Sequence, residues 1–163
     1  MAIPVYLWLY DEDGKLLKGG VAVHGREGSI ELVGMQHDVF IPTDDMIGAT
    51  TGTRQHEAYT FEKEIDSSTP FLYRALTTGR TLAKAEFKYY RINYNGIEEE
   101  YFNVQLENVK VCHVVPVMFD TKIPHFEKHG HIEHVGLRYE KVIWNYIDGN
   151  IRHADSWKER QTA

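Results

Sequence analysis

The chain has 163 residues, a net charge of −6, 42% hydrophobic and 26% charged residues. This composition is typical of a globular domain with its own core, so we expect residues 1–163 to form one domain. The acidic balance, without a dense run of Lys and Arg, argues against a nucleic-acid partner. No apolar run approaches the roughly 18 residues of a membrane span, and the N-terminus lacks the basic region of a signal peptide. Neither membrane insertion nor signal-peptide export is therefore expected.

The first half of the chain is expected to form strands that are separated by turns. Residues 3–10 are rich in Val, Trp and Tyr and predict a first strand, which ends at the turn-forming residues 11–14. Residues 29–40 predict a second long strand, although their alternation of apolar and polar side chains is imperfect. Residues 41–55 then break the pattern with Pro, Gly and Thr, and predict a long protruding loop. Met46 and Ile47 are apolar in this polar loop, which favours a functional role over a passive surface excursion.

One helix is expected, at about residues 69–78. Ser68 or Thr69 can cap it, Pro70 suits its first turn, and Gly79 is a typical residue to end it. Its apolar side chains have helical spacing and should pack on a sheet. They are Phe71, Leu72, Ala75 and Leu76.

The second half predicts further strands. Residues 81–93 and 97–115 flank the Asn95-Gly96 pair, which is a strong hairpin signal. Residues 131–147 predict another long strand, and residues 151–157 a short final one. Several long strands, one helix and tight turns indicate a β-sandwich or a closed barrel with the helix docked at one side.

No catalytic centre emerges from the residues. The single cysteine, Cys112, cannot form an intramolecular disulfide, and its apolar surroundings predict a small buried side chain. His131 and His134 belong to a histidine-rich segment, but its spacing matches no zinc motif, and strand alternation would point these two in opposite directions. We therefore expect no metal site and a solvated segment. Its ionisable residues are His125, Glu127, His129, His131, Glu133 and His134.

The aromatic content points to a binding partner. The chain has ten Tyr, seven Phe and three Trp, and Tyr89 and Tyr90 place rings on both faces of one strand. Tyr and Trp are favoured where one end of the ring is buried and the other is wet, as at interfaces. A neighbouring copy of the chain is the simplest partner. Two alternatives remain open at this point: a carbohydrate-binding β-sandwich, and a zinc-dependent hydrolase built on residues 125–134.

Several segments resemble the haemolysin-coregulated (Hcp) family of type VI secretion systems, and most closely its enterobacterial branch. They follow the family's order over essentially the whole chain, and residues 63–70, which lead into the helix, are the most specific. The matching segments are 26–31, 61–70, 76–79, 106–111, 137–142 and 148–157.

The resemblance implies a small β-barrel of two packed sheets with one flanking helix, and a structural protein without catalytic residues, cofactor or metal. It implies homohexameric rings that stack into a tube inside a sheath, with a spike protein at the tip and effector proteins in the lumen. Assembly in the bacterial cytoplasm would be followed by secretion through the type VI system.

The resemblance also implies two kinds of site residue. Gln36, in the strand expected at residues 29–40, would face the lumen. The loop at residues 41–55 would contact the next ring through Asp44, Asp45, Met46, Ile47, Thr50, Thr51 and Arg54.

Overall fold

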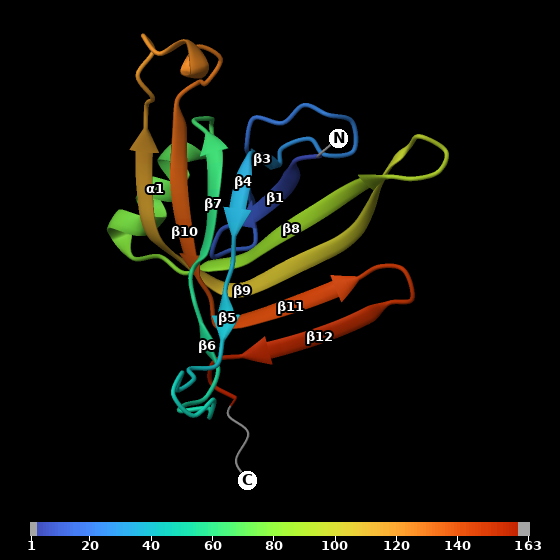
Figure 1. Ribbon diagram of the computed structural model, residues 1–163. Helices are drawn as coiled ribbons and strands as arrows, with labels where there is room; N and C mark the ends of the chain where they lie inside the picture. Colours follow the sequence, from blue (N-terminus) through green and yellow to red (C-terminus); the bar gives the residue numbers. More distant parts are fainter. Residues whose placement is uncertain (1–2, 160–163) are drawn as a thin grey trace.

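Antiparallel strands make up most of the computed structural model, which describes residues 3–159 (Figure 1). The mostly β fold with one short α-helix is confirmed. In chain order the elements are β1 (Val5–Tyr10), β2 (Leu16–Leu17), β3 (Ile30–Leu32), β4 (Gly34–Gln36), β5 (Val39–Phe40), β6 (Gln55–His56), β7 (Tyr59–Glu64), α1 (Thr69–Thr78), β8 (Leu82–Ile92), β9 (Glu98–Val117), the 3-10 turn η1 (Pro124–Phe126), β10 (Ile132–Arg138), β11 (Lys141–Tyr146) and β12 (Ile151–Ser156).

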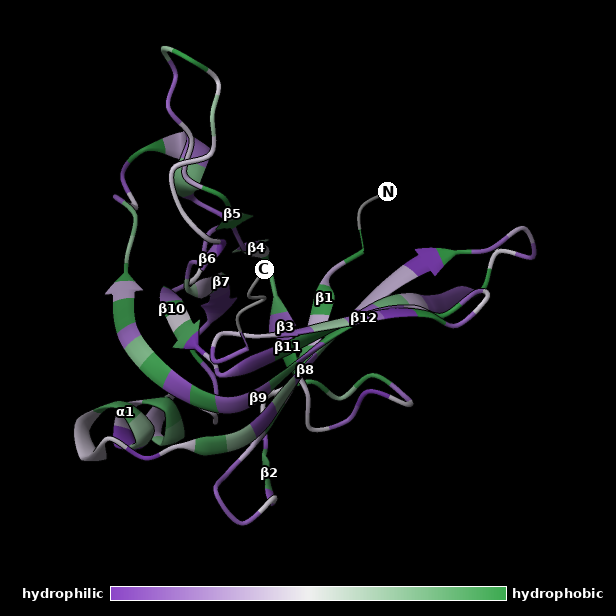
Figure 2. Cartoon of the chain, turned by 90° about the horizontal axis from the view of Figure 1, so that it is seen from below, coloured by the Kyte–Doolittle hydropathy of each residue, from purple (hydrophilic) through white to green (hydrophobic). Residues whose placement is uncertain are grey.

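The strand β9 joins the two halves of the sheet. The Asn95-Gly96 hairpin is confirmed, since β8 and β9 pair on either side of it. Over residues 102–107, β9 also pairs with β11, and over residues 110–117 it pairs with β10. The main path of paired strands runs β2-β1-β8-β9-β10-β7-β4. Polar and apolar residues alternate along the curved strands, so that one face of the sheet is buried around a common core (Figure 2).

The segment expected as one strand at residues 29–40 is instead three short strands. β3 pairs with β1 and β4 pairs with β7, and only Val33 separates them. The backbone N–H of Val33 donates to the carbonyl of Glu62 over 2.9 Å. The chain bends here because β3 pairs with β1, near one end of the path of strands, whereas β4 pairs with β7 and ends the path on the other side. This bend gives the sheet its barrel-like form.

The strand expected at residues 131–147 is also divided. β10 and β11 both run along the same edge of β9, but β10 pairs on its other edge with β7, whereas β11 pairs with β12. Tyr139 and Glu140 lie between them, and the Tyr139 ring is turned into the interior. The break is therefore the point at which the sheet splits into two branches.

The helix α1 has the predicted bounds, and Gly79 ends it in the left-handed conformation at φ 66°. Fewer of its apolar side chains are buried than predicted. Leu72 and Ala75 are buried in the core, whereas Phe71 is 37% exposed at the rim. Ser68 occupies the N-cap position, but its hydroxyl does not cap a helical N–H; it donates to Asp66 instead, at 2.5 Å.

Cys112 is exposed, which corrects the expected buried side chain. Val109 and Val111 point into the core from β9. Val111 and His113 pair with the consecutive residues Leu137 and Gly136 of β10, so Cys112 is the extra residue of a β-bulge, and its side chain lies outside the core. The apolar character of its neighbours in sequence did not determine its side of the sheet.

Gly136 provides the room that the ring of His113 occupies on the outer face of β9 and β10. A Cβ at position 136 would lie 2.1 Å from His113 Cε1. We expect Gly136→Ala to lower the free energy of unfolding by about 1–3 kcal/mol, because the ring must move or strain the strand. Urea denaturation should show most of the loss restored in Gly136→Ala/His113→Ala. Gly34→Ala is the control, since its Cβ would meet only the carboxylate end of Glu62, at 3.3 Å. An equal loss in the control would refute this explanation.

Candidate assembly surfaces and the anchor of the projecting arm

Residues 41–55 form the predicted protruding loop, whose two sides are held together as a projecting arm (Figure 1). Its stem is the two-stranded ribbon of β5 and β6, in which Val39 pairs with His56. Further out, Thr43 and Thr50 form a β-bridge, and the N–H of Thr51 donates to the carbonyl of Pro42 over 2.8 Å. These contacts hold the two sides of the arm together and present its tip to solvent.

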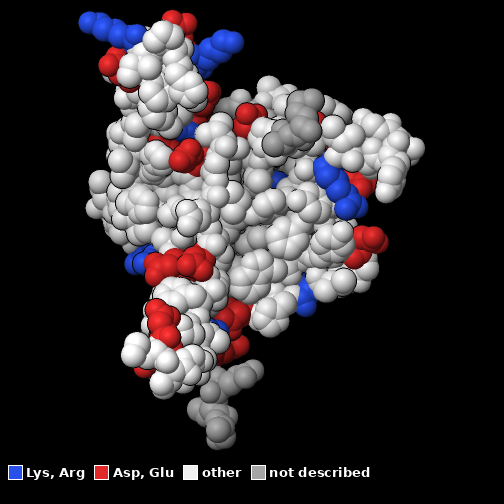
Figure 3. All heavy atoms as spheres, viewed as in Figure 1, with Lys and Arg blue, Asp and Glu red and all other residues white. Residues whose placement is uncertain are grey.

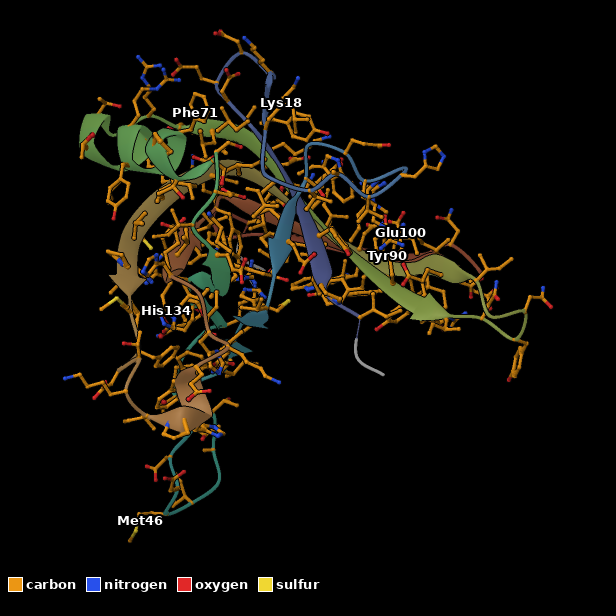
Figure 4. All side chains as sticks on the ribbon, turned by 90° about the horizontal axis from the view of Figure 1, so that it is seen from above. Lys18, Met46, Phe71, Tyr90, Glu100 and His134 are labelled. Carbon is orange, nitrogen blue, oxygen red and sulfur yellow. The ribbon has the colours of Figure 1, made fainter. Side chains whose placement is uncertain are left out.

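The tip of the arm is formed by Asp44, Asp45, Met46 and Ile47. The carboxylate of Asp44 accepts the N–H of Met46 at 2.8 Å and fixes the turn. Met46 is 93% and Ile47 75% exposed, which is rare for such large apolar side chains. Figure 4 shows Met46 at the far end of the arm, directed away from the barrel. Thr50 and Thr51, on the returning side of the arm, are exposed as well.

Arg54 lies apart from the tip, at the base of the arm. Its guanidinium makes a two-pronged ion pair with Asp155 at the end of β12, at 2.5 and 2.8 Å. It also donates to the carbonyl of Ser156 at 2.7 Å. Arg54 therefore binds the arm to the C-terminal strand of its own chain. The hydrogen bonds from Arg54 hold the pKa of Asp155 down at about 2, so this pair is charged at neutral pH.

A chain of hydrogen bonds continues from this pair into the core. His56 Nε2 lies 2.8 Å from Asp155, His56 Nδ1 lies 2.7 Å from the hydroxyl of Tyr139, and that hydroxyl lies 2.6 Å from His37 Nε2. Since Asp155 accepts only, neutral His56 donates through Nε2–H and accepts the Tyr139 hydroxyl at Nδ1. The oxygen of Tyr139 then accepts Nε2–H of His37. We call Arg54, Asp155, His56, Tyr139 and His37 the arm clamp.

The arm clamp disfavours a positive charge on His37. Burial lowers the pKa of His37, and the nearby His56 lowers it further, whereas Asp38 raises it. The fold therefore favours the neutral ring of His37, which donates its Nε2–H to the Tyr139 oxygen.

A second polar network lies inside the barrel, where β7 leads into α1. Lys63 and Glu133 are fully buried and face each other on β7 and β10, with Nζ 2.5 Å from the carboxylate. Lys63 also pairs with Asp66 at 3.0 Å, and Thr69 donates to Glu133 at 2.8 Å. Burial raises the pKa of Asp66, but hydrogen bonds from Ser68 and Lys63 bring it below its ordinary value. The segment 63–70 of the resemblance therefore has a structural role: its buried Lys63 and partly buried Asp66 and Thr69 link β7 and α1 to Glu133 on β10.

Gln36 lies on the outward face of the sheet formed by β4, β7, β10 and β9. It borders a shallow depression with Thr60, Glu62, His113 and His134. His134 and Glu62 approach to 3.3 Å across this surface. The lumen-facing role of Gln36 stays a prediction.

The histidine-rich segment is dispersed in space, and the predicted solvated segment is wrong for one member, because Glu133 is fully buried against Lys63. His134 lies on β10, whereas His125 belongs to η1 in the connection between β9 and β10. Within residues 3–159, no three His, Cys, Asp or Glu side chains come together in a way that could hold a metal ion. No helix of that part is long and apolar enough to cross a membrane.

The fold is that of the Hcp proteins. The structure of an Hcp1 protein of E. coli EAEC 042 superposes with a TM-score of 0.87 at 57% identity, covering 96% of this chain and 99% of that one. The Hcp3 protein of Pseudomonas aeruginosa shares the fold with a TM-score of 0.78 at 24% identity, covering 97% and 100%. The "Major exported protein" of Pseudomonas aeruginosa is 28% identical over 97% of both chains.

Residues 6–146 match the family described as "Type VI secretion system effector, Hcp". The chain therefore belongs to the Hcp family and is a structural, exported tube component of the type VI secretion system. The similarity to the E. coli protein supports the enterobacterial branch. Family membership displaces both a carbohydrate-binding module and a zinc hydrolase as interpretations of the aromatic and histidine residues.

Proposed function

We propose that the chain forms homohexameric rings that stack into the inner tube of the secretion system. The free edge of β12 is the observation that best supports ring formation: among residues 3–159, Ile151–Ser156 pairs with β11 alone, and its first residues are exposed. Exposed strand edges invite pairing and are normally covered. A heterologous contact with a neighbouring copy would cover this edge, and such a contact closes into a ring when the rotation permits.

The projecting arm supplies the contact between rings in this proposal. It is the most prominent projection at its end of the molecule (Figure 1), and its tip carries exposed apolar side chains. The whole chain would act as one domain, with Gln36 facing the lumen and its effector cargo. Sheath and spike proteins would be the other partners, with assembly in the cytoplasm before secretion.

Removal of the tip should separate ring formation from stacking. We expect purified wild-type protein to sediment as a hexamer, and a variant lacking Asp44–Thr53 to remain hexameric, because Arg54 and the arm clamp are retained. Electron microscopy should then show single rings in place of stacks, and secretion should fall. Unchanged secretion would contradict the role of the arm. Wild-type protein that stays monomeric at high concentration would contradict the ring itself.

A further inference from the structure

The projecting arm and the connection between β9 and β10 lie at opposite ends of the molecule. In Figure 1 the arm extends below the barrel, whereas residues 118–131 extend above it on the same side. Seen along this direction in Figure 4, the connection partly overlies the base of the arm. If a second copy were placed directly below the first in the view of Figure 1, the arm of the first copy would therefore lie near the upper connection of the second.

The upper connection carries a preformed aromatic surface. The rings of Phe119 and Phe126 stack at 4.8 Å with an angle of 11° between their planes, and His129 packs 5.2 Å from Phe119. The N–H of Phe126 donates to the carbonyl of Ile123, and that of His129 to Phe126, so the backbone holds the rings in place. Met118, 66% exposed, and Ile123, 42% exposed, extend this surface. We call residues 118–129 the aromatic platform.

Charges border the aromatic platform. Lys122 and Lys128 are exposed, and neither makes an ion pair within the described part of the chain. Figure 3 shows lysine or arginine side chains reaching outward at the upper end, and acidic side chains on the arm at the lower end. Asp120 and Glu127 also belong to the platform, so its charge is mixed and its lysines are the groups that suit an acidic partner.

The tip of the arm has the complementary chemistry. Met46 is a flexible thioether, and methionine sulfur makes favourable contacts with aromatic rings. Asp45 is exposed beside it and, in the described residues, makes no ion pair. Tyr94 and Ile151 are also large and exposed, but they belong to hairpins that project sideways from the barrel (Figure 1).

We propose that the arm tip of one copy docks on the aromatic platform of a second copy of this chain in the next ring. Met46 and Ile47 cover the half-buried rings of Phe119 and Phe126 and the exposed Met118, while Asp45 approaches Lys122 or Lys128. This proposal rests on the proposed stacking of rings, and it gives the histidine-rich segment a place in that contact. It makes the stacking head-to-tail, because the two surfaces belong to opposite ends of each subunit.

Charge reversal tests the pairing of the two surfaces. We expect Asp45→Lys, or Lys122→Glu with Lys128→Glu, to reduce stacking roughly tenfold while rings persist, because several identical contacts act together at each ring junction. Combining the three substitutions should restore stacking. Sedimentation velocity and negative-stain microscopy measure both ring and stack. Asp13→Lys, in the exposed β1–β2 turn, is the matched control and should stack like wild type.

A crosslink gives an independent measurement. In a Cys112→Ser background, Met46→Cys with Ile123→Cys should form disulfide-linked ladders under mild oxidation, whereas either cysteine alone should not. Loss of stacking in Asp45→Lys without rescue by the lysine reversals, together with absence of the ladder in stacked rings, would overturn this docking and leave the proposed stacking intact. Wild-type rings that never stack would instead refute the proposed function, and the docking with it.

Discussion

Replacement of Lys63 by Met is expected to lower the free energy of unfolding by about 3–5 kcal/mol, the typical cost of removing one partner from a buried ion pair. Lys63 and Glu133 are fully buried on adjacent strands, and one oxygen of Glu133 has no hydrogen-bond partner in the described residues. The variant would leave the Glu133 carboxylate in the core with only Thr69 as a donor. Denaturant titration of the purified protein, with the loss of tryptophan signal as the readout, measures the change.

The double variant Lys63→Met/Glu133→Leu distinguishes a lost attraction from an unpaired charge. We expect it to recover most of the stability, since an apolar pair of similar volume removes the buried carboxylate altogether. Arg91→Met is the surface control: its ion pair with Glu99 is exposed and screened by solvent, so its loss should leave the stability nearly unchanged. If the double variant were as unstable as Lys63→Met, packing and not charge would be the cause.

Asp155→Asn is expected to loosen the base of the projecting arm by about 1.5–3 kcal/mol, the usual range for hydrogen bonds to a charged group. Arg54 and His56 would both lose their anionic partner. Amide hydrogen exchange should accelerate at residues 54–57 and 152–157, and much less in β8. Glu57→Gln is the matched control, because Glu57 faces Arg138 across an exposed 3.8 Å pair at the same base. Equal acceleration in both variants would refute the arm clamp.

The same measurement against pH should show two separate steps. The pKa of His37 is lowered in the folded protein, so the unfolded chain binds more protons as pH falls, and the clamp should weaken once pH drops below about 6.5. The pKa of Asp155 is lowered to about 2, so its contribution is complete above about 3.9 and disappears as pH falls through 2. Asp155→Asn should keep the first step and lose the second.

The helix and the central hairpin were predictable because their signals are local. Pro70 and Gly79 mark the ends of α1, and Asn95-Gly96 marks the turn between β8 and β9. The breaks at Val33 and at Tyr139-Glu140 were not predictable, because a strand that changes partners has the same local sequence pattern as one that keeps a single partner. The apolar neighbours of Cys112 wrongly predicted a buried side chain, because the sequence does not reveal the β-bulge at this residue.

The polar networks that hold the arm and the helix could not be predicted from the sequence for a different reason. Arg54 and Asp155 are 101 residues apart, and no spacing rule connects them. From the sequence, Lys63 would be expected on the surface, because its buried partner Glu133 comes from the distant strand β10. The conspicuous histidines at residues 125–134 drew attention, whereas His56, isolated in sequence, is the one buried in a network.

The stem of the arm has a consequence for how such proteins diversify. Because β5, β6 and the arm clamp already bring the two ends of the arm together, a longer or shorter tip changes only the closure of a small loop. Doubling a loop's length costs only about 0.6 kcal/mol, far less than altering a barrel strand. The sequence of the tip can therefore vary between related chains while the barrel stays the same. Such variation would keep the subunits of different chains from stacking on one another.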